Sequence, residues 1–148
     1  MTDSLLLFLT LLLLIAGIIS IPFLPHSAKA KTNFLFVLLI AAITSIPAIR
    51  ALTGNDVDIV ISKTPVFGSI SFHIDKLSSW FILIINLTCL NGAFYGIGYM
   101  KHYDHQKSNL SMHWILFLLF QSSMLWVCLV QNGLAFLIVW ELMSISSF

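Results

Sequence analysis

Long apolar stretches separated by short polar segments dominate the pattern of this chain. A helix that crosses the hydrocarbon core of a bilayer needs about 20 apolar residues. Four stretches reach or approach that length: residues 5–24, 34–52, 77–100 and 114–130. A fifth apolar stretch, residues 134–148, follows a tight Asn132-Gly133 turn. The pattern predicts an all-α integral membrane protein with four full transmembrane helices and a truncated fifth.

The fifth stretch is too short to cross a membrane. Residues 134–148 would form a helix of about 22 Å, whereas the hydrocarbon core is about 30 Å thick. No Lys, Arg, Gly or Pro closes the run. We therefore expect residues 1–148 to be one N-terminal transmembrane region of a larger protein. A truncated gene product, a split protein and a fragment remain open as explanations.

Residues 57–74, between the second and third apolar stretches, follow a different pattern. Apolar and polar residues alternate in Val57–Ser62 and again in Val66–Ile74, with Pro65 in the polar break between them. Alternation with a period of two is typical of a half-buried strand. The pattern predicts a short β-hairpin, which would need support from helix ends or a neighbouring subunit because an isolated hairpin is marginal in water.

The basic residues of the loops predict an orientation. Lys29 and Lys31 lie between the first two stretches, and Lys101 and Lys107 lie between the third and fourth. Because short cytoplasmic loops carry an excess of Lys and Arg, these two loops are expected in the cytoplasm. The N-terminus and the β-hairpin are then extracytoplasmic. We expect an integral protein of a prokaryotic inner (cytoplasmic) membrane.

The composition agrees with a membrane protein and excludes several other classes. The chain is 59% hydrophobic and 9% charged, with a mean hydropathy of +0.99, whereas soluble domains carry about 25% charged residues. This argues against a soluble enzyme, a disordered segment and a disulfide-stabilised secreted module. The net charge of +1 gives no basic surface for a nucleic acid.

Glu141 is the candidate functional residue. It lies about 12 Å into the membrane at the helical rise of the fifth stretch, where ionisable residues are rare and usually serve ion or proton movement. Ser144 lies one turn further on the same face. The alternative is a carboxylate that only packs against a cation or a backbone group. No Lys or Arg lies deep in an apolar stretch, so a partner cation is expected from other sequence or another subunit.

Two further groups of residues within the apolar stretches are candidates for helix contacts. Three polar side chains could bond across helices or line a polar path: Asn86, Asn91 and Gln121. Three glycines form a ridge of small residues that would permit close helix packing: Gly92, Gly96 and Gly98. Packing is the favoured interpretation of both groups.

The remaining polar positions indicate structure rather than a cofactor. Asp75 precedes the third apolar stretch, where it would cap the helix together with Ser78. His102 and His105 resemble half of a metal site, but without a second cluster the favoured interpretation is ordinary surface residues. No cysteine cluster, dinucleotide or nucleotide motif is present, so no metal and no cofactor is expected.

Three segments together resemble one membrane protein family. Phe72–Ser78 resembles the "xxDxLS" entry to the third helix of antiporter-like, proton-conducting subunits. Tyr95–Met100 resembles the "Y-S-x-G-Y-M" exit from that helix, with Gly96 where Ser is common. Phe136–Phe148 resembles the fifth-helix "WE-(L/M)-M-S-(L/I)-x-S" stretch. Such subunits occur in complex I (NADH:quinone oxidoreductase), group 4 membrane-bound hydrogenases and Mrp-type antiporters.

The resemblance implies a role in proton translocation. It matches Glu141 to the family's fifth-helix glutamate, which pairs with a lysine on the seventh helix. It implies a non-redox subunit of a membrane redox complex, with electron transfer in partner membrane subunits and with protons as the moved ion. Two alternatives stay open: a Na⁺/H⁺ antiporter subunit of the Mrp type, and a structural or assembly component in which Glu141 docks to a partner's cation.

Overall fold

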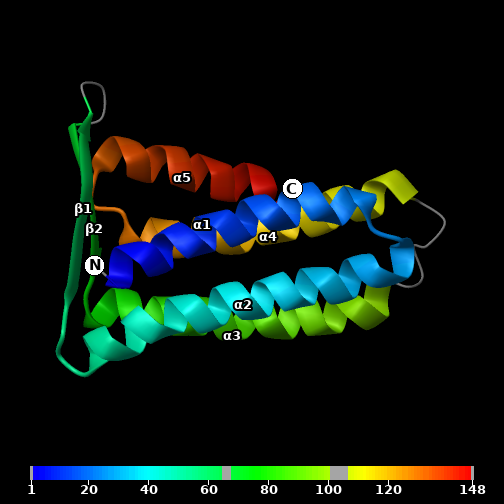
Figure 1. Cartoon of the computed structure of the whole chain (residues 1–148), viewed down its shortest axis with the longest axis horizontal. Helices are drawn as coiled ribbons and strands as arrows, with labels where there is room; N and C mark the ends of the chain where they lie inside the picture. The colour runs from blue at the N-terminus through cyan, green and yellow to red at the C-terminus, as the bar shows by residue number, and fades with distance from the viewer. Residues whose placement is uncertain (1, 65–67, 101–106, 148) are drawn as a thin grey trace.

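The computed structural model describes residues 2–64, 68–100 and 107–147. This part of the chain folds into a helical bundle with a two-stranded sheet across one end (Figure 1). In chain order the elements are α1 (Thr2–Ser20), the short 3-10 helix η1 (Ile21–Phe23), α2 (His26–Leu52), β1 (Val57–Thr64), β2 (Gly68–Ile74), α3 (Lys76–Tyr99), α4 (Lys107–Leu129) and α5 (Gly133–Ser146).

Four of the described helices are long and apolar enough to cross a membrane. Their apolar spans are Asp3–Phe23, Ala28–Leu52, Lys76–Tyr99 and Leu110–Leu129. The prediction of four full spans is therefore confirmed. The fifth helix, α5, is shorter, with 14 residues.

Two helices begin earlier than their apolar stretches. α2 begins at His26, directly after Pro25, whose extended backbone (ψ 152°) precedes the first turn. Lys29 and Lys31 therefore belong to α2, and the prediction that they lie in a loop is wrong. A lysine need not mark the end of a membrane helix, because its apolar stem can lie along the helix while its charged end reaches water or a polar group of another helix. α4 likewise begins at Lys107 rather than near Trp114.

The predicted hairpin is present between α2 and α3. β1 and β2 pair antiparallel with Val57 opposite Ile74 and Asp58 opposite His73, and a bulge interrupts the register between Val60 and Ser62. The side of the membrane on which the hairpin lies stays a prediction.

β2 is attached to the turn between α4 and α5. Phe72 forms a bridge with Val130, and the Gln131 amide N–H donates to the Ser71 carbonyl at 3.0 Å. The Phe72 ring also meets the Trp126 ring edge to face, at 5.3 Å between centroids. These contacts supply the support that an isolated hairpin would lack.

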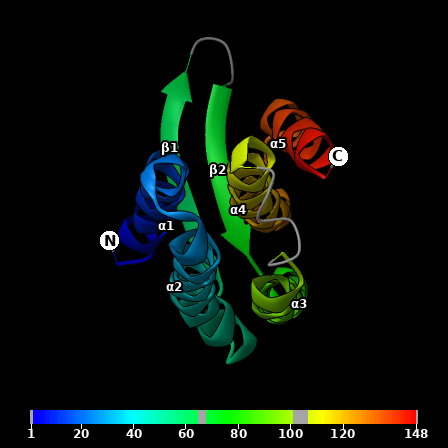
Figure 2. The ribbon, with the colours of Figure 1, turned by 90° about the vertical axis from the view of Figure 1, so that its right-hand side faces the viewer.

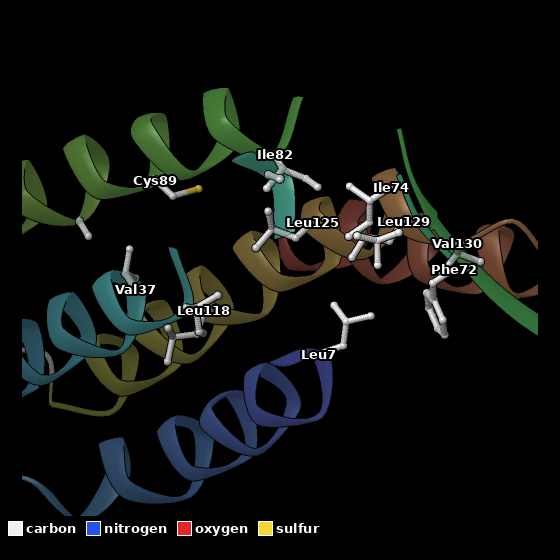
Figure 3. Close-up of a cluster of buried hydrophobic side chains, with 14 of the residues drawn as sticks. Leu7, Val37, Phe72, Ile74, Ile82, Cys89, Leu118, Leu125, Leu129 and Val130 are labelled. Carbon is white, nitrogen blue, oxygen red and sulfur yellow. The ribbon is translucent and has the colours of Figure 1, made fainter. Parts of the chain in front are cut away.

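The helices pack around α4. Viewed along the bundle, α4 lies between α5 on one side and α1 and α2 on the other, with α3 beside α2 (Figure 2). Buried apolar side chains from several helices and from β2 meet in one cluster (Figure 3). Its members include Leu7, Val37, Phe72, Ile74, Ile82, Cys89, Leu118, Leu125, Leu129 and Val130.

Candidate functional site

α5 presents Glu141 on a face that no described element covers. The helix begins at the Asn132 cap, whose side-chain oxygen accepts from the Leu134 and Ala135 amides at 3.1 Å each. α5 packs against α4, and Glu141 points away from the buried cluster, so its side chain is exposed. The neighbouring Leu137 (59%) and Trp140 (52%) are also largely exposed.

Glu141 borders an open groove on this face. The groove has a volume of about 490 Å³ and is lined by Leu137, Ile138, Trp140, Glu141 and Ser144. Apart from the carboxylate, the Ser144 hydroxyl and the indole N–H of Trp140, the lining is apolar. The structure thus places Glu141 and Ser144 together, on an apolar surface of a helix that begins at the hairpin end of the bundle (Figure 1).

Glu141 makes no hydrogen bond or ion pair with any residue that the structure describes. Two cations of the described helices interact with other groups. Arg50 pairs with Asp3 at 3.1 Å near the hairpin end. Lys29, only 4% exposed, donates to the Ser111 hydroxyl at 2.5 Å. The described part of the chain therefore supplies a carboxylate without its counter-charge.

Asn86 connects α3 to α2. Its side-chain amide donates to the Ala41 carbonyl at 3.2 Å, the Thr44 hydroxyl at 2.9 Å and the Ser45 hydroxyl at 3.1 Å. With 3% exposure, Asn86 lies inside the bundle and far along the chain from α5. It joins two helices, and the structure does not bring it to Glu141.

Gln121 makes a similar connection from α4. It is fully buried, and its Nε2 donates to the Val37 carbonyl of α2 at 3.4 Å. Asn91, in contrast, is exposed on α3. The three polar residues grouped together in the sequence thus take different positions, two inside the bundle and one outside.

The three glycines of α3 also differ in their surroundings. A Cβ added to Gly96 would lie 2.8 Å from the Trp114 ring, and one added to Gly92 would lie 3.4 Å from the Phe117 ring. A Cβ added to Gly98 would meet no described atom within 4 Å. Gly92 and Gly96 therefore lie at the α3–α4 contact, whereas Gly98 does not.

Asp75 and His73, at the junction of β2 and α3, each form a hydrogen bond with a different partner. Asp75 is the N-cap of α3, and its carboxylate accepts from the Ser78 amide at 2.7 Å; the hydrogen bonds from Ser78 lower the pKa of Asp75. His73 Nδ1 lies 2.6 Å from an Asp58 carboxylate oxygen on the paired strand. The hydrogen bond to Asp58 raises the pKa of His73. Both interactions serve local structure.

His102 and His105, considered for a metal site, lie outside the described residues. In the part of the chain that the structure describes, no group of three His, Cys, Asp or Glu side chains is placed to hold a metal ion.

Sequence reasoning missed that Lys29 and Asn33 of α2 are buried. Asn33 is fully buried, and neither of its side-chain amide atoms has a described hydrogen-bond partner. It follows Lys29 by four residues, so both lie on one helix face. That spacing was the available signal, and it was hidden because Lys29 was assigned to a loop.

The sequence matches one protein family model and is similar to several proteins named as antiporter subunits. Residues 66–109 match the family model described as NADH-Ubiquinone oxidoreductase (complex I), chain 5 N-terminus. The chain is also similar to proteins named "Putative antiporter subunit mnhA2". Identity is 33% over 96 residues for the one from Staphylococcus saprophyticus (64% of this chain, 12% of the relative). It is 36% over 80 residues for Staphylococcus epidermidis (54% and 10%) and 33% over 105 residues for Staphylococcus aureus strain JH9 (71% and 11%). The chain thus spans about a tenth of the length of the curated relatives it matches.

Proposed function

Because the chain belongs to the antiporter-like family of proton-conducting membrane subunits, we propose that it forms the N-terminal transmembrane region of such a subunit. Glu141 is a carboxylate of the proton path in that subunit. The observation that carries this proposal is an ionisable side chain on the uncovered apolar face of a membrane helix, beside an open groove. In this proposal the partners of the chain are further membrane subunits, and any redox cofactor belongs to those subunits.

The energetic argument begins with the exposed face of α5. A carboxylate at the centre of a membrane helix costs about 2.5–3.5 kcal/mol on insertion scales. In lipid, the groove would offer the ionised carboxylate apolar side chains and two neutral donor groups at most, the Ser144 hydroxyl and the Trp140 indole N–H, with no counter-charge. The side chain therefore requires protein, water or a cation on this face. Because Glu141 lies at the surface of the described bundle, any of these groups can approach the carboxylate and move away again.

A carboxylate in this position can act as a proton relay. With a cation close by, the ionised form is favoured; when the cation moves away, desolvation favours the neutral acid. Movement of a neighbouring charge therefore loads and unloads a proton at Glu141. Ser144, one turn further along α5, can donate a hydrogen bond to the ionised form or accept one from the acid.

Two assemblies are consistent with this role. The matching family model is described as a complex I chain, which favours a proton-translocating subunit of a membrane redox complex. The relatives named as antiporter subunits favour a cation/proton antiporter equally. In both, we place the hairpin and the N-terminus on the extracytoplasmic side, since α2, whose first turns carry Lys29 and Lys31, begins at the end of the bundle opposite the hairpin.

The test is Glu141→Gln in the intact assembly, in inverted membrane vesicles. Proton uptake is followed with a pH-sensitive dye, at matched electron flux for a redox complex or at a matched Na⁺ gradient for an antiporter. We expect Gln, which keeps the shape but cannot ionise, to abolish most of the proton movement, and Asp to preserve part of it. Leu142→Ala, at an exposed position of α5 that does not line the groove, is the control for disturbance of α5.

The outcomes separate the alternatives. Undiminished proton movement in Glu141→Gln at a normal level of assembled protein refutes the role. Loss of assembly that is restored when Glu141 exchanges places with its partner cation identifies a docking carboxylate instead. Proton movement that depends on Na⁺ identifies the antiporter.

A further inference from the structure

A line of polar groups follows the face of α2 that packs against α3 and α4. It consists of the Lys29 and Asn33 side chains and the Val37 and Ala41 backbone carbonyls. These four residues follow one another at intervals of four, so they lie along one face. From Lys29 to Ala41 this face extends about 18 Å at the helical rise. That is more than half of the hydrocarbon thickness of a membrane.

Side chains of α3 and α4 contact this line at three levels. The contacts are Lys29 Nζ to Ser111 Oγ at 2.5 Å, Gln121 Nε2 to the Val37 carbonyl at 3.4 Å, and Asn86 Nδ2 to the Ala41 carbonyl at 3.2 Å. They do not satisfy all of the polar atoms present. Five side-chain atoms along the line are buried and have no described hydrogen-bond partner: Asn33 Nδ2, Asn33 Oδ1, Gln121 Oε1, Asn86 Oδ1 and Trp114 Nε1.

These unpartnered atoms belong to residues deep in the bundle. Asn33 and Gln121 are 0% exposed, Trp114 is 1% exposed and Asn86 is 3% exposed. Lipid cannot hydrogen-bond to them even where the bundle opens, because hydrocarbon offers neither donors nor acceptors. Buried polar groups without protein partners are usually satisfied by ordered water, which makes two to four hydrogen bonds.

The chemistry of the five atoms selects water among small ligands. Two of them are donors, on Asn33 and Trp114, and three are acceptors, on Asn33, Gln121 and Asn86. An anion would satisfy only the donors. A metal cation would satisfy only the acceptors and would be repelled by Lys29. Water both donates and accepts.

The unpartnered atoms lie at successive levels of one interface. α2 and α4 run in the same direction, away from the end of the bundle opposite the hairpin (Figure 1). Because Lys29 contacts Ser111 and Val37 contacts Gln121, Asn33 lies between these two levels. That is the stretch of α4 that carries Trp114, whose ring packs against Gly96 of α3 (2.8 Å from a Cβ placed there).

We propose that the α2–α3–α4 interface binds a line of ordered water molecules that extends from Lys29 to Asn86. Lys29 is the only charged side chain that the described residues place on this line, and it marks the end of the line where it donates to Ser111. This water site is independent of the role proposed for Glu141, since α5 lies on the other side of α4 (Figure 2).

The test is radiolytic hydroxyl-radical labelling of the full chain in its membrane, with the products located by mass spectrometry. Radicals formed from bound water oxidise adjacent side chains even where bulk solvent has no access, and Trp114 is a sensitive reporter. Leu7, buried on α1, a helix that carries none of the unpartnered atoms, is the dry reference. After correction for the reactivity of the free amino acids, we expect Trp114 to be labelled several-fold faster than Leu7. Equal slow labelling of the two residues overturns the proposal.

Variants test whether the labelling depends on the line. Asn33→Leu and Gln121→Leu should each lower the labelling of Trp114, whereas Asn91→Leu, at an exposed position of α3, should leave it unchanged. A variant that fails to fold would raise the labelling of the buried Leu7 as well, and the wild-type comparison then decides alone. The labelling of Trp114 and the proton movement tested with Glu141→Gln are separate measurements. Either proposal can therefore be refuted without refuting the other.

Discussion

Replacing Gly96 by Ala tests the close contact between α3 and α4. A Cβ built at Gly96 lies 2.8 Å from Cη2 and 3.3 Å from Cζ3 of Trp114. Carbon atoms in good contact are about 3.5–4.0 Å apart, so the ring or the helix must move. Trp114 is 1% exposed, and a buried ring of this size has little room to turn. Gly98, two residues further along α3, offers a matched control because an added Cβ meets no described atom within 4 Å.

The expected magnitude follows from two opposing terms. Overpacking a well-filled core costs about 1–3 kcal/mol, and replacing Gly by Ala inside a helix gains up to about 1 kcal/mol. Gly96→Ala should therefore lower the free energy of unfolding by about 0–2 kcal/mol, whereas Gly98→Ala should leave it unchanged or raise it. The difference between the variants, about 1–3 kcal/mol, isolates the packing term because both gain in helix propensity.

The assay is reversible unfolding of the chain in mixed lipid–detergent micelles, followed by the helical circular dichroism. Trp114→Phe supplies the second arm of a double-mutant cycle, since Phe lacks the ring that carries Cη2. In the Phe background Gly96→Ala should be better tolerated than in the wild type. Equal stabilities of Gly96→Ala and Gly98→Ala, or an unchanged cost in the Phe background, would refute the packing argument.

Two further predictions use the same unfolding measurement. Asn86→Leu should cost about 0.5–2 kcal/mol because Asn86 bonds three groups of α2, whereas Asn91→Leu at an exposed position should cost little. The pKa of His73 is raised by its hydrogen bond to Asp58, so the pair stabilises the hairpin below the ordinary histidine pKa, and this contribution is lost as pH rises through the raised value. The protection of the hairpin amides against hydrogen exchange, corrected for the intrinsic rise of the exchange rate with pH, should fall across that interval, and Asp58→Asn should abolish this fall; an unchanged pH profile of the protection in that variant would contradict the argument.

The number of spans and the hairpin could be predicted because each depends on a local pattern. Apolar length decides whether a helix can cross a membrane, and the alternation in residues 57–74 decides the strands. Both properties are contained in a few consecutive residues. The start of α2 could not be predicted in this way. A lysine between two apolar stretches is typical of a loop. Only the contact of Lys29 with Ser111, 82 positions away, shows why it is buried.

The position of Glu141 along α5 was predictable, but the direction in which its side chain points was not. Helical rise from the Asn132-Gly133 turn places Glu141 about 12 Å along α5. Which side of the bundle the carboxylate faces depends on how α5 packs against α4, and that packing involves residues far from Glu141 in the chain. The fate of Asn86, Asn91 and Gln121 shows the same limit, because their equal polarity gave no indication that two face inward and one outward.

The hairpin sets the position of Glu141 through the start of α5. β2 holds the segment before α5 at two points, the Phe72–Val130 bridge and the hydrogen bond from Gln131 to Ser71. Asn132 then caps the first turn. From that fixed start the depth of Glu141 depends only on helical rise, so a shift of β2 along its axis would move the carboxylate with it. The hairpin therefore belongs to the machinery that positions the candidate site, although it lies at the end of the bundle.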